Sequence, residues 1–274
     1  MKRRLLWTLL TLGPCAYAQW LNYPAPGTPR TRDGKPNLSA KAPRASNGKP
    51  DLSGVWHVEP TSRAEMKRLF GDDVDKLDIP GMEIDTISKY AVNVLLDFKP
   101  EQAPLRPETA AMLKNAKGYV GGCLPIGIPI TFLVSEPDEI VQAPTQILML
   151  FESDGTHRQI HLDGRPLPKD PEPSWLGYSV GKWEGDTLVV ETTGFNDRTV
   201  LDIIGHPHSE SLRVVERYHR RDFGHMDVEV TFDDPKVYTK PFSIKFTQRL
   251  FADSDILETI CNENERDLAH IGRN

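Results

Sequence analysis

The chain has 274 residues, of which 38% are hydrophobic and 8% aromatic, and its formal net charge is −6. This length and composition are those of a globular protein with one large domain or two small ones. The acidic balance, with no Lys/Arg cluster interleaved with aromatic residues, argues against a nucleic-acid partner. No glycine-rich phosphate loop, Cys-x-x-Cys, His-Glu-x-x-His or dinucleotide motif occurs, so no nucleotide cofactor is expected.

Residues 1–18 have the pattern of a secretory signal peptide, with a basic start, an apolar run and an Ala-Tyr-Ala end. We therefore expect cleavage before Gln19 and a secreted or periplasmic protein. The apolar run, residues 5–13, is shorter than the roughly 20 residues that a membrane span needs, so no transmembrane segment is expected after signal removal. A lipid anchor on Cys15 is the alternative, because "LGPC" approximates a lipobox, although Pro14 stands where such a box has a small residue.

Signal removal takes away three basic residues and no acidic one, so the net charge of the mature chain is about −9. It also leaves two cysteines, Cys123 and Cys261. An even pair in an oxidising compartment predicts a disulfide bond between them. Two separately buried thiols are the alternative.

The N-terminal part divides into an arm and a helical region. Residues 19–53 are polar and rich in proline, and they contain a short repeat, "GKPNLS" (34–39) and "GKPDLS" (48–53). They predict an extended arm that either lies on the domain or hangs free. Apolar spacings of three and four then predict helices at 63–70, 83–98 and 106–116. We interpret the region of about 63–116 as a helical insertion in a single mainly-β domain that covers residues 54–274.

After Gly118, short β-prone runs alternate with turn residues, and several of these runs alternate apolar with polar side chains. The predicted strands are 130–134, 139–143, 146–152, 157–163, 178–184, 187–193, 212–220, 226–232, 242–251 and 256–261. Their short connections predict an antiparallel meander, and closure into a barrel or barrel-like sheet removes its exposed edges. The predicted fold class is therefore mainly β, with a few short helices in the N-terminal third.

The stretch "GYSVG" (177–181) matches the Gly-x-Ser-x-Gly pattern of a serine nucleophile. That motif requires a helix directly after the serine, but Gly181 is followed by a strand pattern. Glu184-Gly185-Asp186 predicts a hairpin turn. We therefore predict that Ser179 is a strand residue and not a nucleophile.

Two resemblances add to this interpretation. "PDLSGVW" (50–56) resembles the Gly-x-Trp signature of lipocalin-like barrels, in which the Trp closes one end of the barrel. "GKPDLSGVW", "HLDGRPLP", "GYSVGKWEGDTLVVETTGFND", "HPHSE" and "DDPKVYTKP" together are similar to a family of secreted bacterial proteins without an assigned activity. The resemblance implies a shared fold and a secreted location, and it implies no mechanism.

The densest group of candidate catalytic residues is His206, His208 and Glu210, which alternate and would share one face of an extended backbone. Such a set predicts either an acid/base site or, through the two histidines, a site for a divalent metal. A polar loop is the alternative. His157 and His161 lie on one face of a predicted strand, where they join this cluster or face solvent.

A second set of candidates lies in and after the turn-rich loop 162–175. Asp163 and Arg165 predict a turn, with a clamp for a substrate carboxylate as the functional alternative. The aromatic residues in this part of the chain predict the lining of a pocket, and a place in the hydrophobic core is the alternative. These candidate ligand-binding residues are Trp175, Tyr178, Trp183, Phe195 and Tyr218.

Two functional hypotheses follow. In the first, the protein binds a small, partly apolar ligand in a barrel-like pocket. In the second, it is a hydrolase or lyase that acts on a small molecule, with His206, His208 and Glu210 as acid/base or metal groups and Asp163 and Arg165 orienting the substrate.

Overall fold

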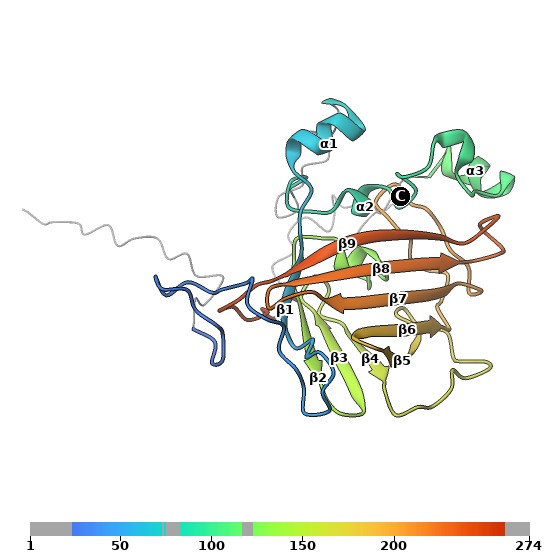
Figure 1. The fold of residues 1–274 in the computed structure, drawn as a ribbon. Coiled ribbons are helices and arrows are strands. Elements are labelled where there is room, and N and C mark those ends of the chain that lie inside the picture. The colour runs from blue at the N-terminus through green and yellow to red at the C-terminus, as the bar shows by residue number, and fades with distance from the viewer. Residues whose placement is uncertain (1–23, 73, 75–82, 117–122, 261–274) are drawn as a thin grey trace, which may run out of the picture.

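Nine strands form a closed barrel in the computed structural model, which describes residues 24–72, 74, 83–116 and 123–260 (Figure 1). The barrel confirms the predicted mainly-β fold class. The signal peptide (1–18) and Cys261 lie outside the described residues, so the cleavage site and the disulfide pairing stay predictions. The strands are β1 (Gly54–Val58), β2 (Asp138–Gln142), β3 (Gln146–Phe151), β4 (His157–His161), β5 (Tyr178–Glu184), β6 (Thr187–Thr193), β7 (Arg213–Arg220), β8 (His225–Asp233) and β9 (Phe242–Leu250).

Neighbouring strands in the barrel are also neighbours in the chain, and β9 closes the ring by pairing with β1. Every pair is antiparallel except β4 and β5, which run parallel. The expectation of a purely antiparallel meander is therefore wrong at this one position. Parallel neighbours need a connection that returns the chain along the sheet, and residues 162–177 supply it without a helix.

The helices occupy the connection between β1 and β2, as predicted. They are α1 (Arg63–Phe70), α2 (Lys89–Val92) and α3 (Pro107–Leu113), with the 3-10 turns η2 (Pro100–Gln102) and η3 (Ile130–Phe132). Figure 1 shows α1, α2 and α3 on one side of the barrel, above β9. None of the helices in the described ranges has the length and apolar composition that a membrane-spanning helix requires.

Three element predictions are wrong in detail. The predicted helix at 83–98 is reduced to α2, because its backbone bonds to other segments: Ser88 N donates to Leu133 O and Val94 N to the Asp202 carboxylate. The predicted strand at 130–134 forms η3, whose residues are buried on all sides. A continuous apolar run of this length does not distinguish a strand from another buried segment. The described part of 256–261 is not a strand.

Trp56 marks one end of the barrel, which we call the arm end because residues 24–53 cover it. Its indole Nε1 donates to Leu52 O at 3.0 Å, and the Arg220 guanidinium lies 4.8 Å from its ring centroid. Arg220 also donates to the carbonyls of Asp51 and Ser53. The cation and the ring are both buried, so together they close this end of the barrel.

The opposite end, which we call the insertion end, is covered by the helical region. Ile203 N donates to Ala91 O, and Thr239 N donates to Pro104 O. These bonds join the helical region to the β6–β7 loop (194–212) and to the β8–β9 loop (234–241). The barrel is therefore covered at both ends, and its wall is the place to examine for a site.

The arm folds into two turns with the same pattern of backbone hydrogen bonds, one at each copy of the repeated sequence (34–39 and 48–53). In the first turn Arg30 forms a two-point ion pair with Asp253, with both distances 2.6 Å. In the second turn Arg44 does the same with Asp186 in the β5–β6 turn, at 3.0 and 2.6 Å. The arm is thus attached to the barrel at both copies rather than extended away from it.

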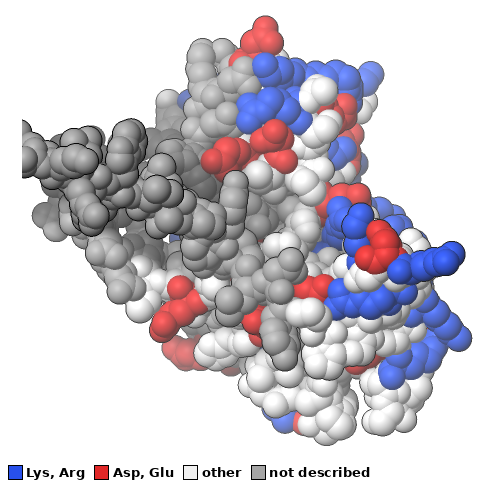
Figure 2. All heavy atoms as spheres, turned by 90° about the vertical axis from the view of Figure 1, so that its left-hand side faces the viewer, with Lys and Arg blue, Asp and Glu red and all other residues white. Residues whose placement is uncertain are grey.

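On the face seen in Figure 2, acidic and basic side chains lie beside one another around the region of α1. Lys and Arg side chains gather along the right-hand edge of this view, with Asp and Glu side chains among them and to their left.

Candidate functional site

The wall of the barrel is weakest between β4 and β5. Their parallel ladder contains two residue pairs, Ile160 with Ser179 and His161 with Val180. On its other side β4 pairs with β3 over its whole length. Toward the insertion end, β4 and the segment that leads into β5 therefore diverge.

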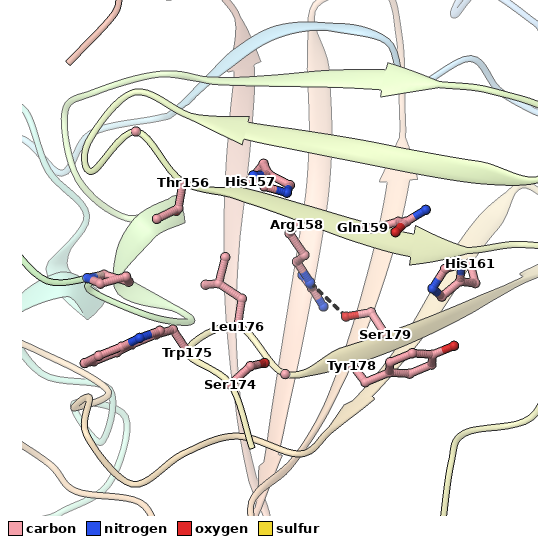
Figure 3. A pocket seen from close by; sticks show the side chains of 13 residues that line it. Thr156, His157, Arg158, Gln159, His161, Ser174, Trp175, Leu176, Tyr178 and Ser179 are labelled. Carbon is pink, nitrogen blue, oxygen red and sulfur yellow. Dashed lines mark hydrogen bonds between the residues drawn. The ribbon is translucent and has the colours of Figure 1, made fainter. Parts of the chain in front are cut away.

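A pocket of about 480 Å³ lies at this divergence (Figure 3). Its size is within the range of small-molecule sites. It combines aromatic and aliphatic side chains with a few polar groups. The residues that line it are Pro125, Gly155, Thr156, His157, Arg158, Gln159, His161, Ser174, Trp175, Leu176, Gly177, Tyr178 and Ser179.

Aromatic side chains form the walls of this pocket. Trp175 lies on one side in Figure 3, and Tyr178 and His161 lie together on the other. The ring centroids of His161 and Tyr178 are 5.1 Å apart with a tilt of 32° between the planes. Trp175 and Tyr178 were both predicted as ligand-binding residues, and the structure places both at the pocket.

Asp163 and Arg165 lie next to the pocket rim, where they form an ion pair of 2.5 Å with each other. The hydrogen bond from Arg165 lowers the pKa of Asp163 to about 2. Arg165 Nη1 also donates to the Tyr178 hydroxyl at 3.1 Å. The pair therefore holds an aromatic wall residue in place, and the Asp163 carboxylate is already occupied.

Arg158 and Ser179 form the floor of the pocket and belong to a polar network inside the barrel. Arg158 donates to both oxygens of Glu216, at 2.9 and 2.5 Å, and to Thr192 at 2.7 Å. Its Nε donates to Ser179 Oγ at 3.0 Å, a bond drawn in Figure 3. The Tyr218 hydroxyl donates to Glu216 at 2.7 Å.

All five members of this network are buried. A buried ion pair with its remaining bonds satisfied fixes one geometry, because each alternative leaves a charge unpaired in the interior. The floor of the pocket is therefore rigid. Ser179 is a buried strand residue, as predicted, and its hydroxyl bonds to Arg158 and Thr192 rather than to a histidine.

The network was missed from the sequence, although the strand alternation contains its signal. Arg158 lies on the same strand face as the apolar Ile160, and Glu216 lies on the same strand face as Val214 and Tyr218. A lone charge on an apolar face predicts a buried partner of opposite sign. Two such charges on different strands predict that the partners are each other.

A second polar pair lies within the barrel wall. Gln248 Nε2 donates to Asp138 Oδ1 at 3.0 Å. Asp138 Oδ2 and Gln248 Oε1 are buried and have no partner among the described residues. Burial raises the pKa of Asp138 to about 8, although the bond from Gln248 acts in the opposite direction.

His206 and His208 have different hydrogen-bond partners within the β6–β7 loop. His206 Nδ1 lies 2.5 Å from Asp202 Oδ2, and the backbone N–H groups of Gly205 and His206 donate to Asp202 Oδ1. His208 Nε2 lies 2.6 Å from Thr199 Oγ1, and burial lowers its pKa. Both rings are thus occupied by separate partners.

Glu210 is exposed. Among the residues that the structure describes, no group of three or more His, Cys, Asp or Glu side chains is arranged to hold a metal ion. The two imidazoles thus have separate partners, and the hypothesis that His206, His208 and Glu210 form a metal or acid/base site stays a prediction. His157 and His161 do not join this cluster, since they line the wall pocket.

The other predicted aromatic residues lie away from the pocket lining. Phe195 and Tyr218 are 1% exposed and belong to the core. Trp183 is partly buried and packs against that core from another part of β5. Phe195 lies behind the pocket, where its ring centroid is 6.0 Å from that of His208.

A second hollow of about 460 Å³ lies on the outer face of β7–β9. Acidic and basic side chains line it together, among them Arg217, Asp227, Glu229 and Lys245. Lys245 pairs with Glu229 at 3.3 Å and Arg221 with Asp227 at 2.9 Å. These charged groups are already paired with one another, so fewer of them are free to bind a ligand here than in the wall pocket.

Comparison of the chain with models of known protein families, with curated proteins and with solved structures gave no match.

Proposed function

We propose that this chain is a secreted or periplasmic protein that binds a small, partly apolar molecule in the pocket between β4 and β5. The observation that carries the proposal is the pocket itself: about 480 Å³ in the barrel wall, with aromatic walls and a polar floor. Small-molecule sites combine a concave, mainly apolar lining with a few fixed polar groups.

The lining fits this description residue by residue. Trp175, Tyr178 and Leu176 supply apolar area, and flat rings bind flat ligands by offset stacking. Thr156 and Gln159 supply hydrogen-bonding groups at the edge. The Arg158 network keeps the floor from collapsing into the pocket, because its members are held by bonds to three other strands.

The proposal places the ligand in the wall and not at the axis of the barrel. In the lipocalin-like barrels that the Gly-x-Trp motif resembles, the Trp closes one end. The pairing of Trp56 with Arg220 supports that part of the resemblance. The helical region covers the other end here, so the divergence of β4 and β5 gives a ligand a lateral route.

A fluorescence titration tests the proposal. N-phenyl-1-naphthylamine is a neutral aromatic probe whose emission rises in apolar surroundings. We expect saturable binding of one molecule per chain, and Trp175→Ala should raise the Kd at least about tenfold, which corresponds to about 1.4 kcal/mol.

The matched control is Trp183→Ala. It also replaces a tryptophan by alanine, but Trp183 lies on β5 and does not line the pocket. It should leave the Kd of the probe within about twofold, within the range of a substitution that touches no ligand. Equal loss of binding in the two variants, or no loss in either, would place the probe elsewhere and contradict the proposal.

A further inference from the structure

The charges around the wall pocket differ from those of the chain as a whole. The sequence contains 39 Asp and Glu residues and is acidic overall. None of them is among the described residues that line the pocket, which instead include Arg158, His157 and His161. In the adjoining turn, the Asp154 carboxylate accepts hydrogen bonds from the backbone N–H groups of Ile126 and Thr156.

Three guanidinium groups lie in the pocket or contact its wall residues, and two of them are paired with a carboxylate. Arg158 is paired with Glu216, and Arg165 is paired with Asp163. The third, Arg198, lies 5.4 Å from the ring centroid of Trp175. Arg198 is exposed and makes no ion pair with any residue in the described part of the chain.

The position of Arg198 beside the pocket wall is fixed by the backbone. Ser174 N donates to Gly194 O at 2.9 Å, and Asn196 N donates to Ser174 O at 2.8 Å. The Asn196 side chain in turn accepts from Arg198 N at 3.1 Å. The loop that carries Arg198 is thus attached directly beside Trp175.

From this charge distribution we infer that the pocket selects an anion, a small flat ring that carries a carboxylate. This inference rests on the proposed function. The ring stacks on the aromatic walls, and the carboxylate lies toward the uncompensated Arg198, with the imidazoles of His157 and His161 as further donors. An anion in a cleft beside an unpaired, exposed cation is attracted to it by an interaction that salt screens.

A matched pair of ligands tests the inference. 2-Naphthoate and 2-naphthalenemethanol share one ring system and differ in charge. Both are used to displace N-phenyl-1-naphthylamine from the full chain at 10 mM ionic strength. We expect the acid to bind at least about tenfold more tightly than the alcohol, with the ratio falling toward one in 1 M salt, where the screening length is about 3 Å.

Arg198→Gln should reduce the ratio of the two affinities at least about threefold, because it removes the unpaired charge and keeps a side chain of similar length. Arg217→Gln, the same change on β7 outside the pocket, should leave the ratio unchanged. Arg198 is exposed, whereas Arg217 is half-buried and forms an ion pair with Glu184. Thermal unfolding therefore confirms that each variant is folded before the titration.

The outcomes separate the two proposals. If the probe binds and the acid and the alcohol displace it equally, the anion preference is overturned and the proposed function stands. The anion preference is likewise overturned, and the proposed function stands, if Arg198→Gln and Arg217→Gln change the ratio of the acid and alcohol affinities by the same factor. If the probe does not bind the unmodified protein, the proposed function fails and the inference fails with it.

Discussion

The guanidinium of Arg158 and the carboxylate of Glu216 form a two-point ion pair inside the barrel, with N–O distances of 2.9 and 2.5 Å. The two side chains are 1% and 0% exposed. They join β4 to β7 across the interior, beneath the pocket in the wall. The pair therefore connects the stability of the barrel to the shape of the site.

Removal of one charge from the Arg158–Glu216 pair should destabilise the folded chain. Glu216→Gln leaves the Arg158 cation buried without a counter-charge, and we expect the free energy of unfolding to fall by about 3–5 kcal/mol. Urea denaturation measures this. The double variant Arg158→Met/Glu216→Leu removes both charges. Its loss of unfolding free energy should be smaller than the sum of the losses in Arg158→Met and Glu216→Leu. Strict additivity would show that the two side chains are not coupled.

The buried carboxyl of Asp138 should make stability depend on pH. Its pKa is raised by burial to about 8 in the folded chain, whereas it is about 3.9 in an unfolded chain. Protonation of Asp138 therefore stabilises the folded chain. This contribution is complete below a pH of about 4 and is lost as the pH rises to about 8. Over this range the free energy of unfolding falls by at most about 1.4 kcal/mol per pH unit.

Asp138→Asn tests this dependence. The substituted amide cannot ionise, and it supplies a donor where Asp138 Oδ2 and Gln248 Oε1 are both unpartnered acceptors. We expect the free energy of unfolding of this variant to fall less steeply between pH 5 and pH 8 than that of the unmodified protein. Urea titrations at several pH values measure both slopes, and parallel curves would rule out Asp138 as the titrating group.

His206 should be structural. His206→Ala removes the ring partner of Asp202, whose side chain is 0% exposed and also accepts from Val94 N. We expect a loss of about 1–3 kcal/mol, the usual cost of a buried hydrogen-bonding group that loses its partner. His219→Ala, at an exposed position on β7, should stay within about 0.5 kcal/mol. Equal unfolding midpoints for the two variants would exclude a structural role for His206.

The two arm turns offer an internal comparison, because the same ion pair occurs in two environments. The side chains of Arg30 and Asp253 are 27% and 7% exposed, whereas those of Arg44 and Asp186 are 47% and 48% exposed. Screening by solvent weakens exposed pairs. Arg30→Gln should therefore lower the thermal midpoint more than Arg44→Gln, and the reverse order would contradict this interpretation.

Much of the barrel could be predicted because strand alternation is local. The run 212–220 places Val214, Glu216 and Tyr218 on one face, and all three are buried in β7. Gly185, with φ of 62°, forms the predicted hairpin turn between β5 and β6. A parallel pair leaves no such local signal, so the β4–β5 arrangement was missed, and the pocket lies there.

Parts of the site could be predicted only where its residues lie close together in the sequence. Trp175 and Tyr178 are close in the chain, and both line the pocket. The spacing of His206 and His208 suggested a shared face, but their partners, Asp202 and Thr199, were set by the fold of the β6–β7 loop. Arg198 acquires its position from a bridge between two loops, which no periodicity encodes.

The most direct test of the proposed site is a crystal structure of the protein grown with 6-bromo-2-naphthol, a neutral flat ligand whose bromine is located by anomalous scattering. We predict one dominant bromine peak in the wall pocket, between Trp175 and Tyr178 and above Arg158. A dominant peak in the outer hollow beside Lys245, or no peak at saturating ligand, would contradict the assignment of the wall pocket as the binding site.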